Sequence, residues 1–369
     1  MSDLRACAGC LRRAWLLVAL SPYIERVATG RPGSRSPELL GLDDEDLARA
    51  VAPRGAAAIL SDVAGVSESE IRGRVRAAGA WAVCRHDERF PAGLREARDA
   101  PRSLICRGDP GRLELLDPGA TVTVVGSRRA TAYGREVARS LGSELAGTGL
   151  LVASGLAFGI DAAAHRGALE RGMTVAVTGC GPDVAYPAAH RSLHRRIGES
   201  GLIVSELAPG ATPWRWTFPA RNRVMAGLAS MTVVVEAAVR SGSLITAEMA
   251  AELGRDVGAV PGPVNSGLSA ATNELLSRGA CVVRGAQDVL DAMLGPGAVP
   301  ERPPGPPLEP ALAEVLAGFE RLGGNPDAVA GALGLGGPEL SLALARLELL
   351  GYLRGSPLGA YVRTALAPP

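Results

Sequence analysis

The stretch that decides the fold is residues 231–260, MTVVVEAAVRSGSLITAEMAAELGRDVGAV. It begins with a β-branched run at 232–235 and passes through a Ser-Gly-Ser loop into a helical segment at 243–254. It ends on a second apolar run at 257–260. An apolar strand, a helix and another apolar strand make one βαβ unit, and the two strands of such a unit are parallel.

The same pattern recurs on both sides of this unit. Each further apolar run leads through a glycine-containing loop into a helical segment such as GREVARSLGSELAG; the runs are VTVV at 122, LLVA at 150, TVAV at 174, LIV at 202 and CVV at 281. Continuously apolar strands that alternate with helices are typical of a parallel, doubly wound sheet covered on both faces. The sequence therefore predicts an α/β, Rossmann-like, mostly parallel sheet over residues 121–295.

The regions flanking this sheet have a different pattern. Residues 1–80 consist of short helical segments, one of them opened by a capping box of Ser67 and Glu70, and predict a small helical domain of the SAM or helix-hairpin-helix kind. We interpret residues 81–120 as a connecting segment and the Pro/Gly-rich residues 296–310 as a stiff linker.

The last segment, residues 311–369, combines three helical patterns with a hairpin turning at Ser356–Gly359. Three helices and a hairpin predict a winged-helix-like module. The helix expected in the place of a recognition helix is Glu339–Leu350, and its charged residues are one arginine, Arg346, and two glutamates, Glu339 and Glu348. A helix that reads the major groove needs more cations, so this module is expected to contact protein rather than DNA.

Composition limits the possible chemistry. The formal net charge is +1, so any site for a polyanion must be a local patch. One such patch is the segment of residues 186–223, which contains six arginines and only two glutamates. The chain contains no lysine, which excludes a Walker-A lysine, a Schiff base and a lysine general base. Every cationic contact is therefore a planar guanidinium, which suits phosphate.

The six cysteines are scattered, and only Cys7 and Cys10 form a CxxC pair. No second pair or histidine cluster accompanies them in the sequence, so we interpret them as small buried residues on an N-terminal helix and expect neither a metal nor a cofactor. The longest apolar run, residues 15–20, is too short to span a bilayer, and no signal-peptide pattern is present. A cytoplasmic location is expected.

Ligands of doubly wound sheets bind beyond the carboxyl ends of the strands, so the loops that follow the strands are the candidate sites. The first loop, GSRRATAYG, offers a tight turn at Gly126, donors at Ser127 and a guanidinium at Arg128, or else a plain βα turn with solvent-facing arginines. It lacks the GxGxxG pattern, which disfavours a nicotinamide site.

The second loop, SGLAFGID, allows close backbone approach at Gly155. Asp161 and His165 follow it with helical i, i+4 spacing. They are either an acid/base pair or, as we favour, residues with structural hydrogen bonds.

The richest segment is residues 214–246, in which arginines, an aromatic ring and a helix N-terminus come together. Guanidinium forks hold phosphates, rings stack on bases, and backbone amides at a helix start bind anions. Trp216 and Phe218 are the candidate rings. Of Arg221 and Arg223, one is expected to face the ligand and the other to hold a carboxylate such as Glu236. The remaining candidates are Arg215, Asn222, Ser241, Gly242, Ser243 and Thr246.

Six segments together resemble the DprA/Smf family of bacterial DNA-processing proteins: GSRRATAYG, SGLAFGIDAAAHRGAL, GCGPDVAYP, FPARNRVMAGL, VVVEAAVRSGSLITAEMAAELGRDVGAVPG and GLSAATNELLSRGA. The resemblance covers residues 122–290 in order. It implies a binding protein rather than an enzyme, which binds single-stranded DNA without sequence preference and loads RecA recombinase onto it during natural transformation and recombination. It also implies a homodimer through the Rossmann-like domain, contact with single-strand-binding protein, and a DNA pocket built from Arg128, Arg215, Phe218 and Ser241–Thr246.

Two other functions stay open. Related sheets hydrolyse nucleoside monophosphates with a PGGxGTxxE loop and a catalytic glutamate. Here the matching segment, EAAVRSGSLITAE, lacks the glycine pair but retains Glu248 on the helix. The flanking domains could alternatively act as an interaction scaffold, which is compatible with DNA binding in the centre.

Overall fold

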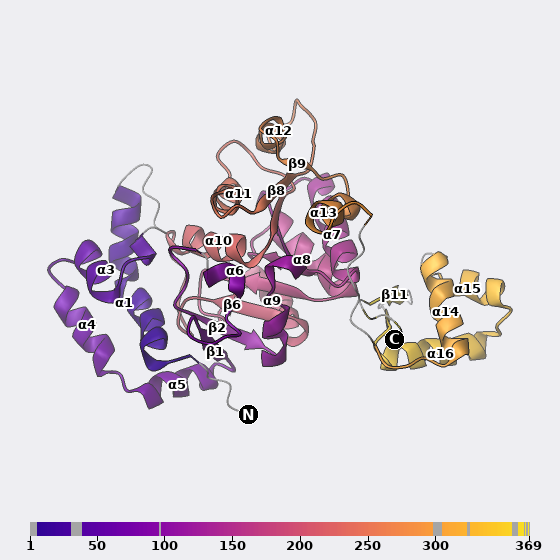
Figure 1. Ribbon diagram of the computed structural model, residues 1–369, viewed down its shortest axis with the longest axis horizontal. Coiled ribbons are helices and arrows are strands. Elements are labelled where there is room, and N and C mark those ends of the chain that lie inside the picture. The colour runs from indigo at the N-terminus through magenta and orange to yellow at the C-terminus, as the bar shows by residue number, and fades with distance from the viewer. Residues whose placement is uncertain are drawn as a thin grey trace.

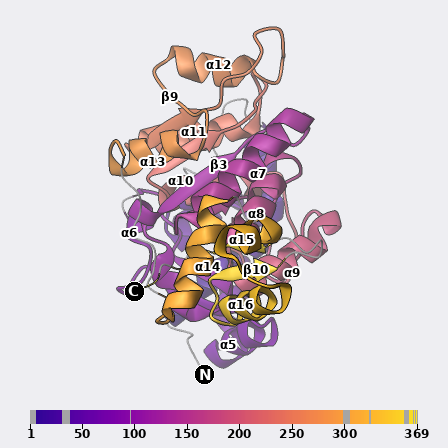
Figure 2. The same cartoon turned by 90° about the vertical axis from the view of Figure 1, so that its right-hand side faces the viewer.

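The computed structural model describes residues 6–30, 39–95, 97–297, 305–322, 325–355, 361–364, 366 and 368. A central sheet carries the N-terminal helices at one end and the C-terminal helices α14, α15 and α16 at the other (Figure 1). Viewed from that second end, the C-terminal helices form a cluster of their own (Figure 2).

The sheet has nine strands in the order β1-β2-β6-β5-β4-β3-β7-β8-β9. All seven predicted strands are present and parallel to one another, which confirms the fold class. Their bounds are β3 (Thr121–Val125), β4 (Leu151–Ser154), β5 (Thr174–Val177), β6 (Leu202–Ser205), β7 (Met231–Val234), β8 (Asp256–Ala259) and β9 (Cys281–Val282).

The interpretation of residues 81–120 as a connecting segment is wrong. The strands β1 (Trp81–Cys84) and β2 (Ser103–Gly108) pair antiparallel, and β2 pairs antiparallel with β6, so both extend the sheet. The short helix α6 (Ala92–Arg95) and the 3-10 turns η1 (Pro110–Leu115) and η2 (Pro118–Ala120) complete the region. The chain between these antiparallel strands contains only α6, a helix of four residues, so the repeating pattern of a strand followed by a full crossover helix does not include them.

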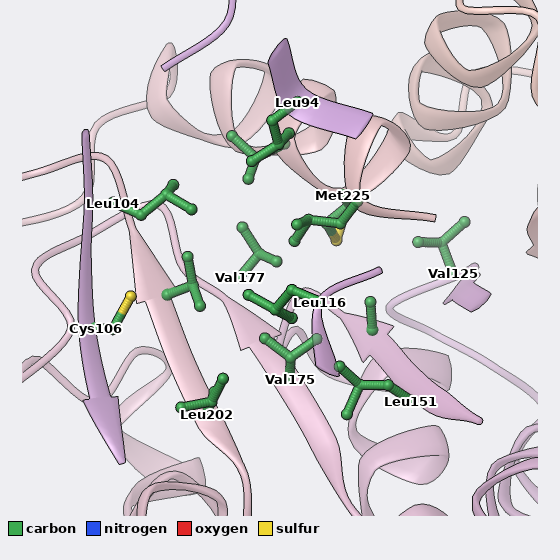
Figure 3. Packing of buried hydrophobic residues seen from close by; sticks show 14 of the residues in the cluster. Leu94, Leu104, Cys106, Leu116, Val125, Leu151, Val175, Val177, Leu202 and Met225 are labelled. Carbon is green, nitrogen blue, oxygen red and sulfur yellow. The ribbon is translucent and has the colours of Figure 1, made fainter. Parts of the chain in front are cut away.

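Helices cover both faces of the sheet. One face packs on α7 (Ala132–Gly147), α8 (Ile160–Arg171), α9 (Arg191–Ser200), which follows the 3-10 turn η3 (Ala188–His190), and α13 (Ala286–Leu294). The other face packs on α10 (Thr217–Leu228), α6 and α11 (Gly242–Glu252). Figure 3 shows this second core, in which Val175 and Val177 of β5 lie with Met225 and Leu94. The helix α12 (Ala270–Ser277) precedes β9.

The N-terminal region is helical as predicted, with α1 (Ala8–Gly30), α3 (Asp44–Val51), α4 (Ala56–Gly65) and α5 (Glu68–Ala77). The Ser67 hydroxyl accepts a hydrogen bond from the Glu70 backbone N–H at 3.2 Å, which caps α5 as the sequence indicated. These helices do not stand apart from the sheet domain. Trp216, only 2% exposed, packs among the leucines of α1 and is a core residue rather than a stacking platform.

The C-terminal region contains α14 (Pro310–Arg321), α15 (Pro326–Leu333), α16 (Gly337–Leu349) and an antiparallel pair, β10 (Leu353–Gly355) with β11 (Tyr361–Arg363). The predicted turn at Ser356–Gly359 and part of the predicted linker lie outside the described residues. The single arginine of α16, Arg346, is already paired with Glu309 at 2.6 Å.

No single helix in the described part of the chain is both long and apolar enough to cross a membrane, whereas α15 and α16, bent by 117°, together meet that criterion of length and composition.

The statement that nothing completes the CxxC pair is also wrong. The fold carries Cys84 and His86, at the end of β1, to the first turn of α1, where Cys7 and Cys10 lie. The sequence distance between the two segments hid this arrangement.

Candidate functional site

A cavity of about 600 Å³ opens beyond the carboxyl ends of β3 and β7. The connections from these adjacent strands run to opposite sides of the sheet, because β4 follows on one side and β8 on the other. Doubly wound sheets bind ligands at this switch point. We call this space the switch-point cavity. Among the predicted site residues its lining includes Gly126, Ser127, Arg128, Phe218, Arg221, Asn222, Ser241, Gly242, Ser243 and Thr246.

The loop after β3 is held tightly against the loop after β7. A Cβ on Gly126 would lie 2.6 Å from Ile160 Cγ1 and 2.8 Å from the Glu236 carbonyl oxygen, so only glycine fits. The Ser127 backbone N–H donates to the Glu236 carbonyl at 2.6 Å. The Glu236 carboxylate accepts hydrogen bonds from the backbone N–H and hydroxyl of Thr131, at 2.9 and 2.6 Å. Glu236 therefore anchors the start of α7.

Arg221 lies at the floor of the cavity and has an internal partner. Its guanidinium is 3.8 Å from the Asp161 carboxylate, and both side chains are more than 90% buried. Burial raises the pKa of Asp161, and the charge of Arg221 opposes this rise. Burial likewise lowers the pKa of Arg221, and Asp161 opposes that fall. Gly155 makes room for the pair, because a Cβ there would overlap the Arg221 guanidinium.

Arg223 lies outside the cavity. It is 4% exposed and binds Glu206 at 2.5 Å, with Asp99 at 3.7 Å. Two residues along a helix turn the side chain by about 200°, so Arg221 and Arg223 point to opposite sides of α10. Arg221 lines the cavity and Arg223 does not, but both are paired with carboxylates of the fold. The expected carboxylate partner, Glu236, is wrong, because Arg223 binds Glu206.

The start of α11 forms the wall opposite β3. The Ser241 hydroxyl accepts from the Ser243 backbone N–H at 3.4 Å and so caps the helix. The Asn222 side-chain amide donates to the Gly242 carbonyl at 3.1 Å and ties α10 to this helix. The Thr246 hydroxyl lines the cavity, is buried, and has no hydrogen-bond partner among the described residues. A helix N-terminus with a spare hydroxyl is suited to an anion.

Three exposed arginines surround the mouth of the cavity: Arg128, Arg129 and Arg240, which we call the rim arginines. Within the described part of the chain, none of them has a carboxylate within 4.0 Å. Because Arg221 and Asp161 compensate each other, the rim arginines leave the cavity positively charged. The Arg128 guanidinium lies over the Phe218 ring, 5.0 Å from its centroid.

An aromatic ledge of Phe158, Tyr186 and Phe218 continues from this rim. The rings of Tyr186 and Phe218 lie 5.8 Å apart, and Phe158 meets His190 edge-on at 4.8 Å. Phe158 is 46% and Tyr186 43% exposed. The ledge borders a second cavity of about 130 Å³, which Gly155 and Arg128 also line.

Sequence reasoning missed Phe158 and Tyr186. A signal existed, since both are rare aromatics in Gly- and Pro-containing loops, AFG and AYP, where a core ring is unusual.

Arg215 is exposed in the loop before α10 and lines neither cavity, so the structure does not bring it to the site. Its neighbour Trp216 fixes this loop to α1, since the Trp216 backbone N–H donates to Glu25 at 3.0 Å.

Asp161 and His165 are not an acid/base pair. His165 Nδ1 lies 2.7 Å from the Thr174 hydroxyl, and burial lowers the pKa of His165 to about 3. Asp161 pairs with Arg221 instead, so the structural interpretation is confirmed. Glu248, the candidate acid of the hydrolase alternative, is exposed on α11 and does not line the cavity.

The fold and the site define a Rossmann-like protein with a positively charged cavity at the switch point of a parallel sheet. The sequence model of the family described as DNA recombination-mediator protein A matches residues 81–294. The chain belongs to this family.

Relatives of this chain carry matching names. "Putative DNA processing protein DprA" of Mycobacterium tuberculosis is 44% identical over 231 residues, 62% of this chain and 58% of the relative. "DNA processing protein DprA" of Streptococcus pneumoniae is 46% identical over 209 residues, 55% of this chain and 71% of the relative. "Protein Smf" of Escherichia coli is 36% identical and the match covers 75% of each chain. The chain thus spans just over half the length of its mycobacterial relative.

Solved structures agree. DNA processing protein A from Streptococcus pneumoniae superposes with a TM-score of 0.60 and 35% identity, covering 78% of this chain and 98% of that one. A Helicobacter pylori homologue, described for its single-stranded DNA binding mode, superposes with a TM-score of 0.53 and 30% identity, covering 58% of this chain and 95% of that one.

Proposed function

We propose that this chain binds single-stranded DNA, without sequence preference, in the switch-point cavity and along the aromatic ledge. The observation that carries the proposal is the juxtaposition of uncompensated rim arginines with the aromatic ledge, which reaches from the switch-point cavity to the smaller cavity beside it. Guanidinium groups hold phosphates and rings hold base faces, and a duplex keeps its base faces stacked inside.

Each wall of the cavity contributes a different contact. The rim arginines hold successive phosphates. The backbone amides at the start of α11 and the unpartnered Thr246 hydroxyl accommodate one more phosphate oxygen. Phe218 and Tyr186 stack on bases, which is tolerant of sequence because every base has a π face.

A longer strand has a path beyond the ledge. Phe158 contacts His190, which immediately precedes α9. Arg191 and Arg196 on α9 are exposed, and neither has a carboxylate within 4.0 Å among the described residues. These arginines extend the line of positive charge away from the cavity.

The role in recombination is supported by the family description and by the Helicobacter pylori relative's single-stranded DNA binding mode. We therefore propose that the bound strand is passed to RecA recombinase, with the chain acting as a homodimer through its Rossmann-like domain on strands coated with single-strand-binding protein, as in natural transformation. The C-terminal module contributes protein contacts, because Arg346 is neutralised by Glu309 and Leu349 is 87% exposed.

The binding test uses fluorescence anisotropy with labelled oligonucleotides across a salt series. We expect single strands to bind more tightly than duplex, with affinity falling steeply as salt rises. Arg128→Ala removes one charged contact and should weaken binding about tenfold, the equivalent of about 1.4 kcal/mol. Arg49→Ala, which removes an exposed arginine from α3, is the matched control. Duplex preference, or unchanged binding by Arg128→Ala, contradicts the proposal.

The mediator role needs a separate assay. RecA strand exchange on strands pre-coated with single-strand-binding protein should be stimulated by the chain, and light scattering should give the mass of a dimer. Removing residues 296–369 should leave DNA binding intact. Binding without stimulation would refute RecA loading while leaving the DNA site in place.

A further inference from the structure

Four metal-ligand side chains from two distant segments meet far from the switch-point cavity. Cys7 and Cys10 lie at the start of α1, and Cys84 and His86 lie at the end of β1. Their Sγ and ring-nitrogen atoms all lie within 4.8 Å of one another. We call this group the Cys-His cluster.

The three nitrogen–sulfur distances within the cluster match the edges of a tetrahedron. His86 Nδ1 lies 3.6 Å from Cys7 Sγ, 3.5 Å from Cys10 Sγ and 3.7 Å from Cys84 Sγ. A tetrahedral zinc ion with Zn–S of about 2.3 Å and Zn–N of about 2.0–2.1 Å separates sulfur from nitrogen by about 3.5 Å. All three observed separations lie close to this value.

Hydrogen bonding alone does not account for the convergence. A neutral imidazole offers one donor or one acceptor at Nδ1, so one thiol satisfies it. Three sulfurs at similar distances around one nitrogen are the arrangement that a shared cation would produce.

The backbone also supports thiolates at this place. The Cys7 backbone N–H points to Cys84 Sγ at 3.4 Å. Backbone N–H groups directed at ligand sulfurs stabilise the deprotonated form that binds metal.

We propose that Cys7, Cys10, Cys84 and His86 bind one zinc ion. Three sulfurs and one nitrogen fill all four positions of a tetrahedral ion, which is the composition of a structural rather than a catalytic site. The site is separate from the proposed DNA cavity and independent of its function.

The zinc ion would fasten the N-terminal helices to the edge of the sheet. Cys10 and Cys84 are buried in a core shared by α1, α5 and β1. Around them the Ala6 backbone N–H donates to the Ala82 carbonyl at 3.3 Å, and the Ser103 hydroxyl donates to the Cys10 carbonyl at 3.0 Å. The ion would cross-link Cys7 and Cys84, which are 77 positions apart in the chain, and so stabilise the contact between α1 and β1 at the edge of the sheet.

The test measures the metal content of the purified full-length chain by elemental mass spectrometry. We expect about one zinc per chain, released by a strong chelator together with a fall in melting temperature. Replacing zinc by cobalt(II) should give the visible bands of a tetrahedral, thiolate-ligated ion. His86→Ala removes an exposed ligand with little packing, and should lose the metal. Cys281→Ser, at a cysteine outside the cluster, should keep it.

Two results overturn the proposal. A wild-type chain that holds no metal, and takes up no cobalt when reduced, shows that the four ligands are only neighbours. A disulfide between Cys7 and Cys10 in the chain purified with reductant, seen by mass spectrometry of peptides, shows a redox pair instead. Both readouts use the wild-type protein and do not depend on whether a variant folds.

Discussion

Phe218→Ala is the sharpest test of the aromatic ledge. The ring contacts the Arg128 guanidinium, 5.0 Å from its centroid, and its centroid lies 5.8 Å from that of the Tyr186 ring. Its removal takes away the face on which a base would stack and the surface that orients Arg128. The substitution should therefore weaken binding of single strands and change the contribution of Arg128.

The expected size follows from these two contacts. A base–aromatic stack contributes about 1–3 kcal/mol, and an exposed cation–π contact about 0.5–1 kcal/mol. Their sum, about 1.5–4 kcal/mol, corresponds to a loss of roughly 10- to 700-fold in affinity. Phe218→Tyr keeps the ring and should bind within about threefold of the unmodified chain.

The assay is an anisotropy titration of Phe218→Ala, Arg128→Ala and the double variant. If the ring orients the guanidinium, the double variant should lose less than the sum of the single losses, by about 0.5–1 kcal/mol. Leu342→Ala, which removes an exposed apolar side chain from α16, is the control and should bind normally. Equal losses for Phe218→Ala and Phe218→Tyr, or normal binding by both, would refute the stacking role.

Three further predictions concern stability. Gly155→Ala should displace Arg221 from Asp161 and lower the free energy of unfolding, measured by calorimetry, by about 1–3 kcal/mol. The control is Gly242→Ala, whose added Cβ meets no atom within 4 Å and should change the free energy of unfolding little. Similar losses in the two variants would contradict the overlap at Gly155. Glu206→Gln leaves Asp99 as the remaining carboxylate beside buried Arg223 and should lower the free energy of unfolding, measured by chemical denaturation, by about 3 kcal/mol. An unchanged free energy of unfolding would mean that Asp99 alone compensates the charge of Arg223. His165 has a pKa near 6.5 in the unfolded chain and of about 3 in the folded chain, so below pH 6.5 the unfolded chain binds a proton that the folded chain does not. The free energy of unfolding is therefore unaffected by His165 above pH 6.5 and falls as the pH is lowered, by up to about 1.4 kcal/mol per pH unit. His165→Gln should flatten that decline, and an unchanged slope counts against it.

Most of the fold could be predicted because interior strands of a parallel sheet are buried on both faces. The strands β3 to β7 are buried along their whole length and therefore are largely apolar runs, and the glycine loops between runs mark the turns, whereas β8 and β9 are only partly buried. The strands β1 and β2 could not be predicted in the same way. Their place in the sheet depends on the pairing of β2 with β6, which lies about 100 residues away in the chain.

The site could be predicted only in outline. Loop positions such as Gly126, Arg128 and Ser241 follow from the rule that ligands lie beyond strand ends, and they do line the cavity. Arg215 and Trp216 were misjudged because residue type does not show which way a side chain points. The packing of the loop against α1 buries Trp216 and leaves Arg215 outside both cavities.

Sequence alone determined the alternation of strands and helices, the lack of lysine chemistry and the family, because these depend on local pattern and residue type. Tertiary structure decided which arginines are paired with carboxylates inside the fold and which remain available to a ligand. Arg221 and Arg223 are paired within the fold, while Arg128 and Arg240 are left at the rim. It also decided that Cys7 and Cys10 meet Cys84 and His86. Distances between residues far apart in the chain are set by packing, which no local spacing records.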